Sequence, residues 1–288
     1  MTEPYSLIKT TLTLKLSTQG SAGLCLNNNK NYKSSFQYSI PPLNFRDESI
    51  EYAYYSVNHA VIPVSFYNMN ESNNRLDLTY SEIIQGQTGT SVSYLFVPGN
   101  YNATTFKTHF LATLGDNWTI SLDSTTNKFT IANSLYSFSV NSTSTISSIL
   151  GFSDSLSSYT TTLGNTIEFP RVCNFLPTPR IHLRCPQFAN SLLVNRNTNQ
   201  TDILVSVPND SKLNGQIVYH NFSKSQTLID VPFLQTFQIN ITDDENNLVN
   251  FNGISSYFEI SIDFYKRRLT ERPPTFQQLI RNFAYHFN

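Results

Sequence analysis

The sequence predicts a mainly β protein: a single jelly-roll β-sandwich with an inserted small α+β module and a short C-terminal helix. Short segments in which apolar and polar residues alternate recur along the chain, as strands with one buried face require. Clusters of Asn, Gly, Pro and Asp separate these segments. Without the module and the termini, roughly 170 residues remain, which suits one eight-stranded double sheet and not two.

We assign the two parts of the jelly roll to residues 1–97 and 169–265. Alternation is clearest at residues 11–16, 238–242 and 258–264. Shorter segments rich in β-branched and aromatic residues supply the other candidate strands, at residues 51–57, 60–67, 74–80, 91–97, 180–185, 202–207 and 216–219.

Residues 98–168 break this pattern and form the predicted α+β module. Between Asn102 and Leu114 the apolar residues fall at helical spacing, with Asn102 as the N-cap and Gly115 at the C-terminal end. The residues that follow predict a β-hairpin, a strand and a short helix, at 118–131, 136–140 and 145–150.

The last segment, residues 266–288, changes character again. Basic residues follow the last strong strand, and the pair Pro273-Pro274 stops any continuation. Four apolar residues then share one helix face: Phe276, Leu279, Ile280 and Phe283. This short amphipathic helix packs either on its own domain or against a neighbouring subunit.

We expect uncharged amides and hydroxyls, more than charged groups, to make the surface polar. Asn, Ser and Thr number 32, 34 and 30, a third of the 288 residues, whereas only 14% are charged and the net charge is −1. An average soluble protein is about 25% charged. We expect no nucleic-acid partner, because no basic run would release counterions, and neither a membrane span nor a secretory signal.

Residues that would carry catalysis are not arranged for it, so we expect no enzyme, no cofactor and no catalytic metal. The five histidines are scattered, and the phosphate-loop and nucleophile-elbow motifs are missing. His182 and Cys185 lie three residues apart in a strand, hence on opposite faces, which predicts an inert buried thiol. The oxygen-rich segment 243–247 is either a hairpin turn or, less simply, a calcium site.

Five segments in the last third of the chain carry a family resemblance: 202–208 (DILVSVP), 215–221 (GQIVYHN), 237–247 (FQINITDDENN), 249–253 (VNFNG) and 257–260 (YFEI). They resemble the C-terminal part of the minor capsid, or penton, proteins of virophages, Polinton-like viruses and related large DNA viruses. Within the module, 97–101 (VPGNY), 127–131 (NKFTI) and 150–152 (LGF) resemble an α+β element of such proteins. Tyr257 and Asn250 replace the Trp and Asp that are common in that family.

The resemblance implies a capsid protein of the virion, made in the host cytoplasm or a viral factory. It implies a jelly roll that forms a homopentamer at icosahedral vertices, contacts the major capsid protein and projects the module outward. The expected capsid contacts are in the N-terminal arm and the C-terminal tail: Leu12, Leu14, Arg267, Arg268, Phe276, Leu279, Ile280 and Phe283.

Two alternatives stay open. The protein could be a minor capsid protein that cements hexameric capsomers instead of occupying the vertex. It could also be a carbohydrate-binding attachment protein, in which the module exposes aromatic residues to a host glycan or receptor. For that role we single out Trp118, Tyr136 and Tyr159, although Trp118 in an alternating strand also suits the core.

Overall fold

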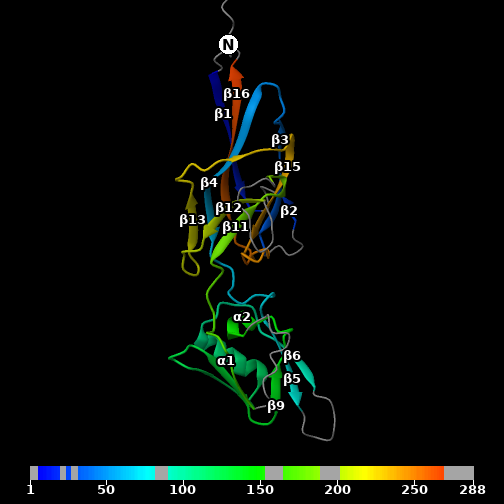
Figure 1. Ribbon diagram of the computed structural model, residues 1–288, viewed down its shortest axis with the longest axis vertical. Coiled ribbons are helices and arrows are strands. Elements are labelled where there is room, and N and C mark those ends of the chain that lie inside the picture. The colour runs from blue at the N-terminus through cyan, green and yellow to red at the C-terminus, as the bar shows by residue number, and fades with distance from the viewer. Residues whose placement is uncertain are drawn as a thin grey trace, which may run out of the picture. The chain divides into compact units, whose positions relative to one another are not determined.

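The computed structural model describes residues 6–19, 24–26, 32–81, 90–152, 165–188 and 202–268 (Figure 1). The chain divides into two compact units, one made of Met1–Phe66 and Arg180–Asn288 and the other of Tyr67–Pro179. We call them unit 1 and unit 2 and describe each by itself. The protein is mainly β, with antiparallel sheets and few helices, as the sequence predicts.

Unit 1 consists of two antiparallel sheets. The first has the order β1 (Ser6–Ser17), β16 (Tyr257–Arg268), β4 (Ile50–Pro63) and β13 (Gln216–His220), and β14 (Thr227–Leu228) also pairs with β4. The second has the order β12 (Ile203–Pro208), β11 (Arg180–Arg184), β15 (Phe233–Thr242), β3 (Ser35–Asn44) and β2 (Leu24–Cys25). A short 3-10 turn, η1 (Pro186–Phe188), follows β11.

Side chains from both sheets of unit 1 meet in one hydrophobic core. Phe36, Tyr55 and Phe237 are among its largest fully buried members, and they come from β3, β4 and β15. Strands β1 and β16 run side by side although they lie near opposite ends of the chain (Figure 1). This strand order is consistent with the predicted jelly roll.

Strands β3 and β4 differ from the prediction. Segment 51–57 and the first part of segment 60–67, expected as separate strands, form the single strand β4, which ends at Pro63. A bulge opposite the Glu259/Ile260 step absorbs Asn58, and pairing continues at His59. Strand β3 was not predicted, because Pro41 and Pro42 cannot donate ladder hydrogen bonds. They lie where the register between β3 and β15 is irregular.

Unit 2 contains two three-stranded antiparallel sheets and two helices. One sheet has the order β10 (Thr166–Glu168), β8 (Phe129–Asn133) and β7 (Trp118–Leu122). The other has the order β6 (Ser91–Leu95), β5 (Arg75–Ser81) and β9 (Ser137–Val140). The helices are α1 (Ala103–Leu114) and α2 (Ser147–Leu150).

Helix α1 forms as its sequence predicts. The Asn102 side chain accepts a hydrogen bond from the Thr105 backbone N–H, and the Thr105 hydroxyl accepts one from the Asn102 N–H, which completes a capping box. Phe106 and Phe110, one turn apart, are fully buried in the core of unit 2. The helix therefore supplies much of the aromatic core on which the two small sheets pack.

Unit 2 extends beyond the predicted module on both sides. We placed its boundaries at residues 98 and 168, where the sequence pattern changes, whereas the compact unit spans Tyr67–Pro179. The reason is non-local pairing: β5, which we assigned to the jelly roll, pairs with both β6 and β9. Periodicity identifies a strand but not its partner.

A buried carboxylate ties β1 to β16. Asp263 on β16 is 3% exposed and accepts hydrogen bonds from the Thr11 hydroxyl at 2.5 Å and the Gln226 side chain. Its Oδ2 lies 2.8 Å from the Lys9 ammonium on β1. Burial alone would raise the pKa of Asp263, but the hydrogen bonds from Lys9 and Thr11 outweigh it and hold the pKa below its usual range. The chain's N-terminal strand is thus held by a charge-assisted contact as well as by its ladder.

We expect Asp263→Asn to destabilise the protein by about 1–3 kcal/mol at pH 7, because Lys9 loses its charge partner and a buried acceptor is removed. Since the folded pKa is lowered, this stabilisation is complete above the unfolded pKa of about 3.9 and disappears as the pH falls through the folded value. Urea denaturation at pH 7 and pH 3 measures the difference. The exposed Asp210→Asn serves as the control, and an equal effect of both variants at pH 7 would contradict the expectation.

Candidate functional site

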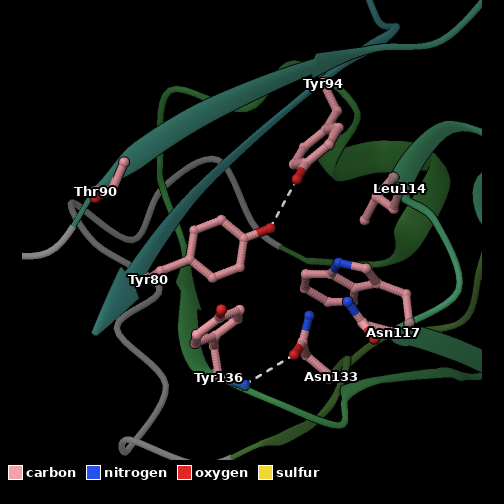
Figure 2. Close-up of a pocket in the computed structure, with 8 residues that line it drawn as sticks. Tyr80, Thr90, Tyr94, Leu114, Asn117, Asn133 and Tyr136 are labelled. Carbon is pink, nitrogen blue, oxygen red and sulfur yellow. Dashed lines mark hydrogen bonds between the residues drawn. The ribbon is translucent and has the colours of Figure 1, made fainter. Parts of the chain in front are cut away.

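A pocket of about 310 Å³ opens in unit 2. Its eight lining residues come from both small sheets, from the end of α1 and from the connecting loops: Tyr80, Thr90, Tyr94, Leu114, Asn117, Trp118, Asn133 and Tyr136. In Figure 2 the Tyr80 and Tyr136 rings face Leu114 and Asn117 across the pocket, and Asn133 enters from below. The volume lies at the lower end of the range of about 300–1,000 Å³ that small-ligand pockets occupy.

Three aromatic rings form one wall of the pocket. The Tyr80 ring meets the Trp118 ring edge-on, with 6.2 Å between centroids, and the Tyr136 ring in the same way at 6.0 Å. The Tyr80 and Tyr94 hydroxyls lie 2.8 Å apart and share a hydrogen bond. Because that bond uses one of the two hydroxyl hydrogens, the pair keeps one donor for a ligand.

Asn133 supplies a fixed hydrogen-bond donor. It ends β8 and is 3% exposed, and its Oδ1 accepts the backbone N–H groups of Leu135 and Tyr136, both at 2.9 Å. Since a side-chain amide oxygen must accept, this turn determines which amide atom is the nitrogen. The nitrogen points into the space between the rings in Figure 2 and donates to none of the residues that the structure describes.

The pocket is polar but uncharged. None of the eight described lining residues is acidic or basic, and all but Leu114 carry a hydroxyl, amide or indole N–H group. Burial raises the pKa of Tyr80, and the hydrogen bond with Tyr94 raises it further, while Trp118 acts in the opposite direction. Tyr80 therefore stays a neutral phenol at physiological pH, and the pocket is suited to a neutral polar ligand.

The structure brings together two of the three aromatic residues chosen for attachment. Tyr136 is 39% exposed. Trp118 is only 4% exposed and belongs to the core, as its alternating strand suggested, and not to an exposed surface: its ring packs at 4.5 Å on Phe138 and at 6.2 Å on Phe110. Trp118 nevertheless lines the pocket. Tyr159 lies outside the described residues.

Asn133, Tyr80 and Tyr94 also line the pocket and were not predicted from the sequence. Both tyrosines lie in segments correctly predicted as strands, but nothing local indicates that β5 pairs with β9 and brings Tyr80 opposite Phe138. Asn133 had one usable signal, since an Asn just after an alternating strand often closes a turn through its side chain.

The predicted capsid contacts are only partly within the described structure. Leu12 and Leu14 are half-buried and pack against the core of unit 1, opposite Ile262 and Ile260 on β16. Part of the surface of Leu12 and Leu14 is therefore already buried within unit 1. Segment 266–268, expected to begin the tail, instead continues β16, where Arg267 and Arg268 pair with Leu7 and Ser6. Phe276, Leu279, Ile280 and Phe283 lie outside the described residues.

The acidic segment 243–247 is a turn. The Asp243 and Asn247 backbones hydrogen-bond at 3.0 Å, the Asp243 carboxylate accepts the Asn247 N–H at 2.7 Å, and Asn246 adopts a left-handed φ of 70°. Asp244 is bound to His182 Nε2 at 2.9 Å and to Arg180 at 3.3 Å. No group of three His, Cys, Asp or Glu residues suited to a metal occurs within the described ranges.

Cys185 has the environment of a structural thiol. It is fully buried, its Sγ donates to Gln187 Oε1 at 3.4 Å, and burial raises its pKa to about 12. His182 is bound to Asp244 instead, in line with the opposite-face argument.

The chain is similar to a solved penton protein. The crystal structure of SeMet-labeled mavirus penton protein matches with 13% sequence identity and a TM-score of 0.43, covering 91% of this chain and 100% of that chain. A penton protein is the class that the sequence resembles. At this identity the likeness assigns no residue a role. No protein-family model and no curated protein matches the chain. None of the helices in the described part of the chain is long and apolar enough to cross a membrane.

We expect Cys185 to react with iodoacetamide at pH 8 at least ~100-fold more slowly in the folded protein than in urea, because little of a thiol with so high a pKa is ionised. Its rate should still rise about tenfold per pH unit between pH 8 and 10, where a thiol of ordinary pKa levels off. Peptide mass spectrometry measures the labelling. Equal rates in native protein and urea would show that the thiol is not buried.

Proposed function

We propose that this protein is a structural virion protein without enzymatic activity: a penton subunit that assembles as a homopentamer at icosahedral vertices and contacts the major capsid protein. In this proposal unit 1 is a single jelly roll, and unit 2 is the module inserted into its sequence. The protein would act in the capsid after synthesis in the host cytoplasm or a viral factory.

The strand order of unit 1 is the observation that carries the proposal. One sheet reads β1-β16-β4-β13 and the other β12-β11-β15-β3, and their eight principal strands enclose one core. This is the arrangement expected of a double-sheet jelly roll, a fold that recurs in viral capsids. Because fold alone does not define function, the sequence resemblance to penton proteins supplies the second support.

A closed ring requires a heterologous interface, in which one flank of each copy packs against the opposite flank of the next. The β13–β14 side of the first sheet exposes large apolar residues: Val218 is 52%, Phe222 88% and Leu228 49% exposed. At the other edge, β1 exposes Leu7 and Ile8, at 49% and 47%. We propose that these two edges meet between neighbouring copies, which would remove the apolar residues from water.

The terminal segments are the proposed contacts to the major capsid protein. The N-terminal arm, with the partly exposed Leu12 and Leu14, is strand β1, which pairs with β16. Arg267 and Arg268 lie at the end of β16, opposite Leu7 and Ser6. Deleting residues 274–288 should reduce incorporation into particles while leaving the fold of the described residues intact. Unchanged incorporation would remove the tail from the proposal.

We expect the purified protein to have a solution mass near five times 32.7 kDa. Phe222→Ser should weaken assembly at least tenfold, about 1.4 kcal/mol, because the largest exposed apolar side chain at the proposed interface is lost. Sedimentation at several concentrations measures this. Leu176→Ser is the matched control, since Leu176 is 78% exposed but lies in unit 2.

A particle reconstruction separates the proposal from its nearest alternative. Five copies around a fivefold axis would support the penton, whereas density between hexameric capsomers would replace it with a cementing protein.

In the sedimentation experiment, equal losses of assembly for Phe222→Ser and Leu176→Ser would contradict the proposed interface.

A further inference from the structure

We infer that the pocket of unit 2 is a binding site for one neutral sugar ring. This inference goes beyond the penton proposal and does not rest on it, because every residue that carries it belongs to unit 2. Three properties of the pocket lead to this ligand class: its aromatic wall, its fixed amide donor and its lack of charge.

The aromatic wall matches the apolar side of a sugar. A pyranose has a face of C–H groups and a rim of hydroxyls, and the electron-rich face of an aromatic ring attracts such C–H groups. Tyr136 is 39% exposed and adjoins Tyr80, whose ring is held by Trp118 on one side and by the Tyr94 hydroxyl at 2.8 Å. The wall is therefore pre-ordered, so a ligand would lose little free energy in arranging it.

The amide donor matches the hydroxyl rim. Asn133 is buried, and the turn to Leu135 and Tyr136 occupies its Oδ1. Its Nδ2 group therefore faces the pocket as a donor without an acceptor among the described residues. The nitrogen keeps some exposure to the pocket, so a ligand hydroxyl can accept its hydrogen bond in place of solvent. The Tyr80–Tyr94 pair and Asn117 offer further hydroxyl and amide groups around the same space.

Charge and polarity argue against other ligand classes. Phosphates, sulfates and carboxylates require basic side chains or clustered backbone donors, and the lining residues that the structure describes include no Lys or Arg. A wholly apolar ligand would leave the Asn133 amide unpaired. A neutral nucleoside is the remaining competitor, because it also combines a planar ring with hydroxyls.

The chain contains a single tryptophan, Trp118, and it lines the pocket. Its fluorescence therefore reports directly on occupancy. We would titrate the purified full-length protein with methyl glycosides of glucose, galactose, mannose and N-acetylglucosamine, and with adenosine and sialic acid. The expected result is a saturable change in emission with at least one neutral glycoside, at a dissociation constant on the order of 1 mM or below.

Two variants test the site itself. Asn133→Asp keeps the oxygen that closes the turn but removes the N–H donor, and Tyr136→Ala removes the exposed ring; each should weaken binding at least tenfold. The control for Asn133→Asp is Asn174→Asp, because Asn174 Oδ1 accepts the Leu176 N–H at 2.9 Å in a turn outside the pocket. The control for Tyr136→Ala is Leu135→Ala, because Leu135 is the exposed neighbour of Tyr136. Both should bind as the unaltered protein does. Thermal unfolding checks that each variant is folded. If Asn133→Asp does not fold, Tyr136→Ala still tests the site.

The inference is overturned if no neutral glycoside gives a saturable change, if adenosine binds and the glycosides do not, or if both pocket variants bind normally.

If a neutral glycoside binds, a glycan array separates the two possible sources of the sugar ring. Binding to terminal sugars of glycan chains indicates a surface glycan, and binding restricted to the free glycosides indicates a small metabolite. The solution mass is measured independently, so a failed sugar titration leaves the pentamer proposal untouched.

Discussion

The pairing of β16 with two strands that are remote in sequence is the constraint on which unit 1 depends. Along one edge β16 pairs with β1, and along the other with β4, so the first and the last described strands lie in one sheet. Such pairing must overcome the loop-closure entropy of most of the chain. The ladder alone does not do this; the core shared with the second sheet and the Lys9–Asp263 contact contribute as well. A separate compact unit can then be accommodated between β4 and β11 without interrupting that core.

The excess of Asn, Ser and Thr acquires a structural explanation in the turns. Among the residues that the structure describes, four of the six non-glycine residues with positive φ are Asn, the residue type that adopts this conformation most readily after glycine. Other amide and carboxylate side chains close turns on their own backbone, as Asn133, Asn174 and Asp123 do. These side-chain oxygens accept backbone N–H groups in the turns that have no ladder partner.

The proposed pentamer and the proposed sugar site make different demands on the two units. A ring interface draws on the exposed apolar edges of unit 1, where area removed from water supplies the free energy. The pocket of unit 2 gains its specificity from a few oriented polar groups around an aromatic wall. Because the two proposals use separate residues, a substitution in one unit should leave the function of the other measurable.

Local pattern was enough for part of this protein. Alternation predicted a mainly β chain, and the run from Asn102 to Gly115 predicted helix α1 with its cap, since both signals depend only on neighbours along the chain. The near-neutral surface was likewise evident from composition. Tertiary structure decided the rest: that residues 50–63 form one strand with a bulge at Asn58, that unit 2 begins at Tyr67, and that Trp118 is buried yet lines a pocket with Asn133. Each of these features depends on which distant strand is the pairing partner, and side-chain periodicity does not specify that partner.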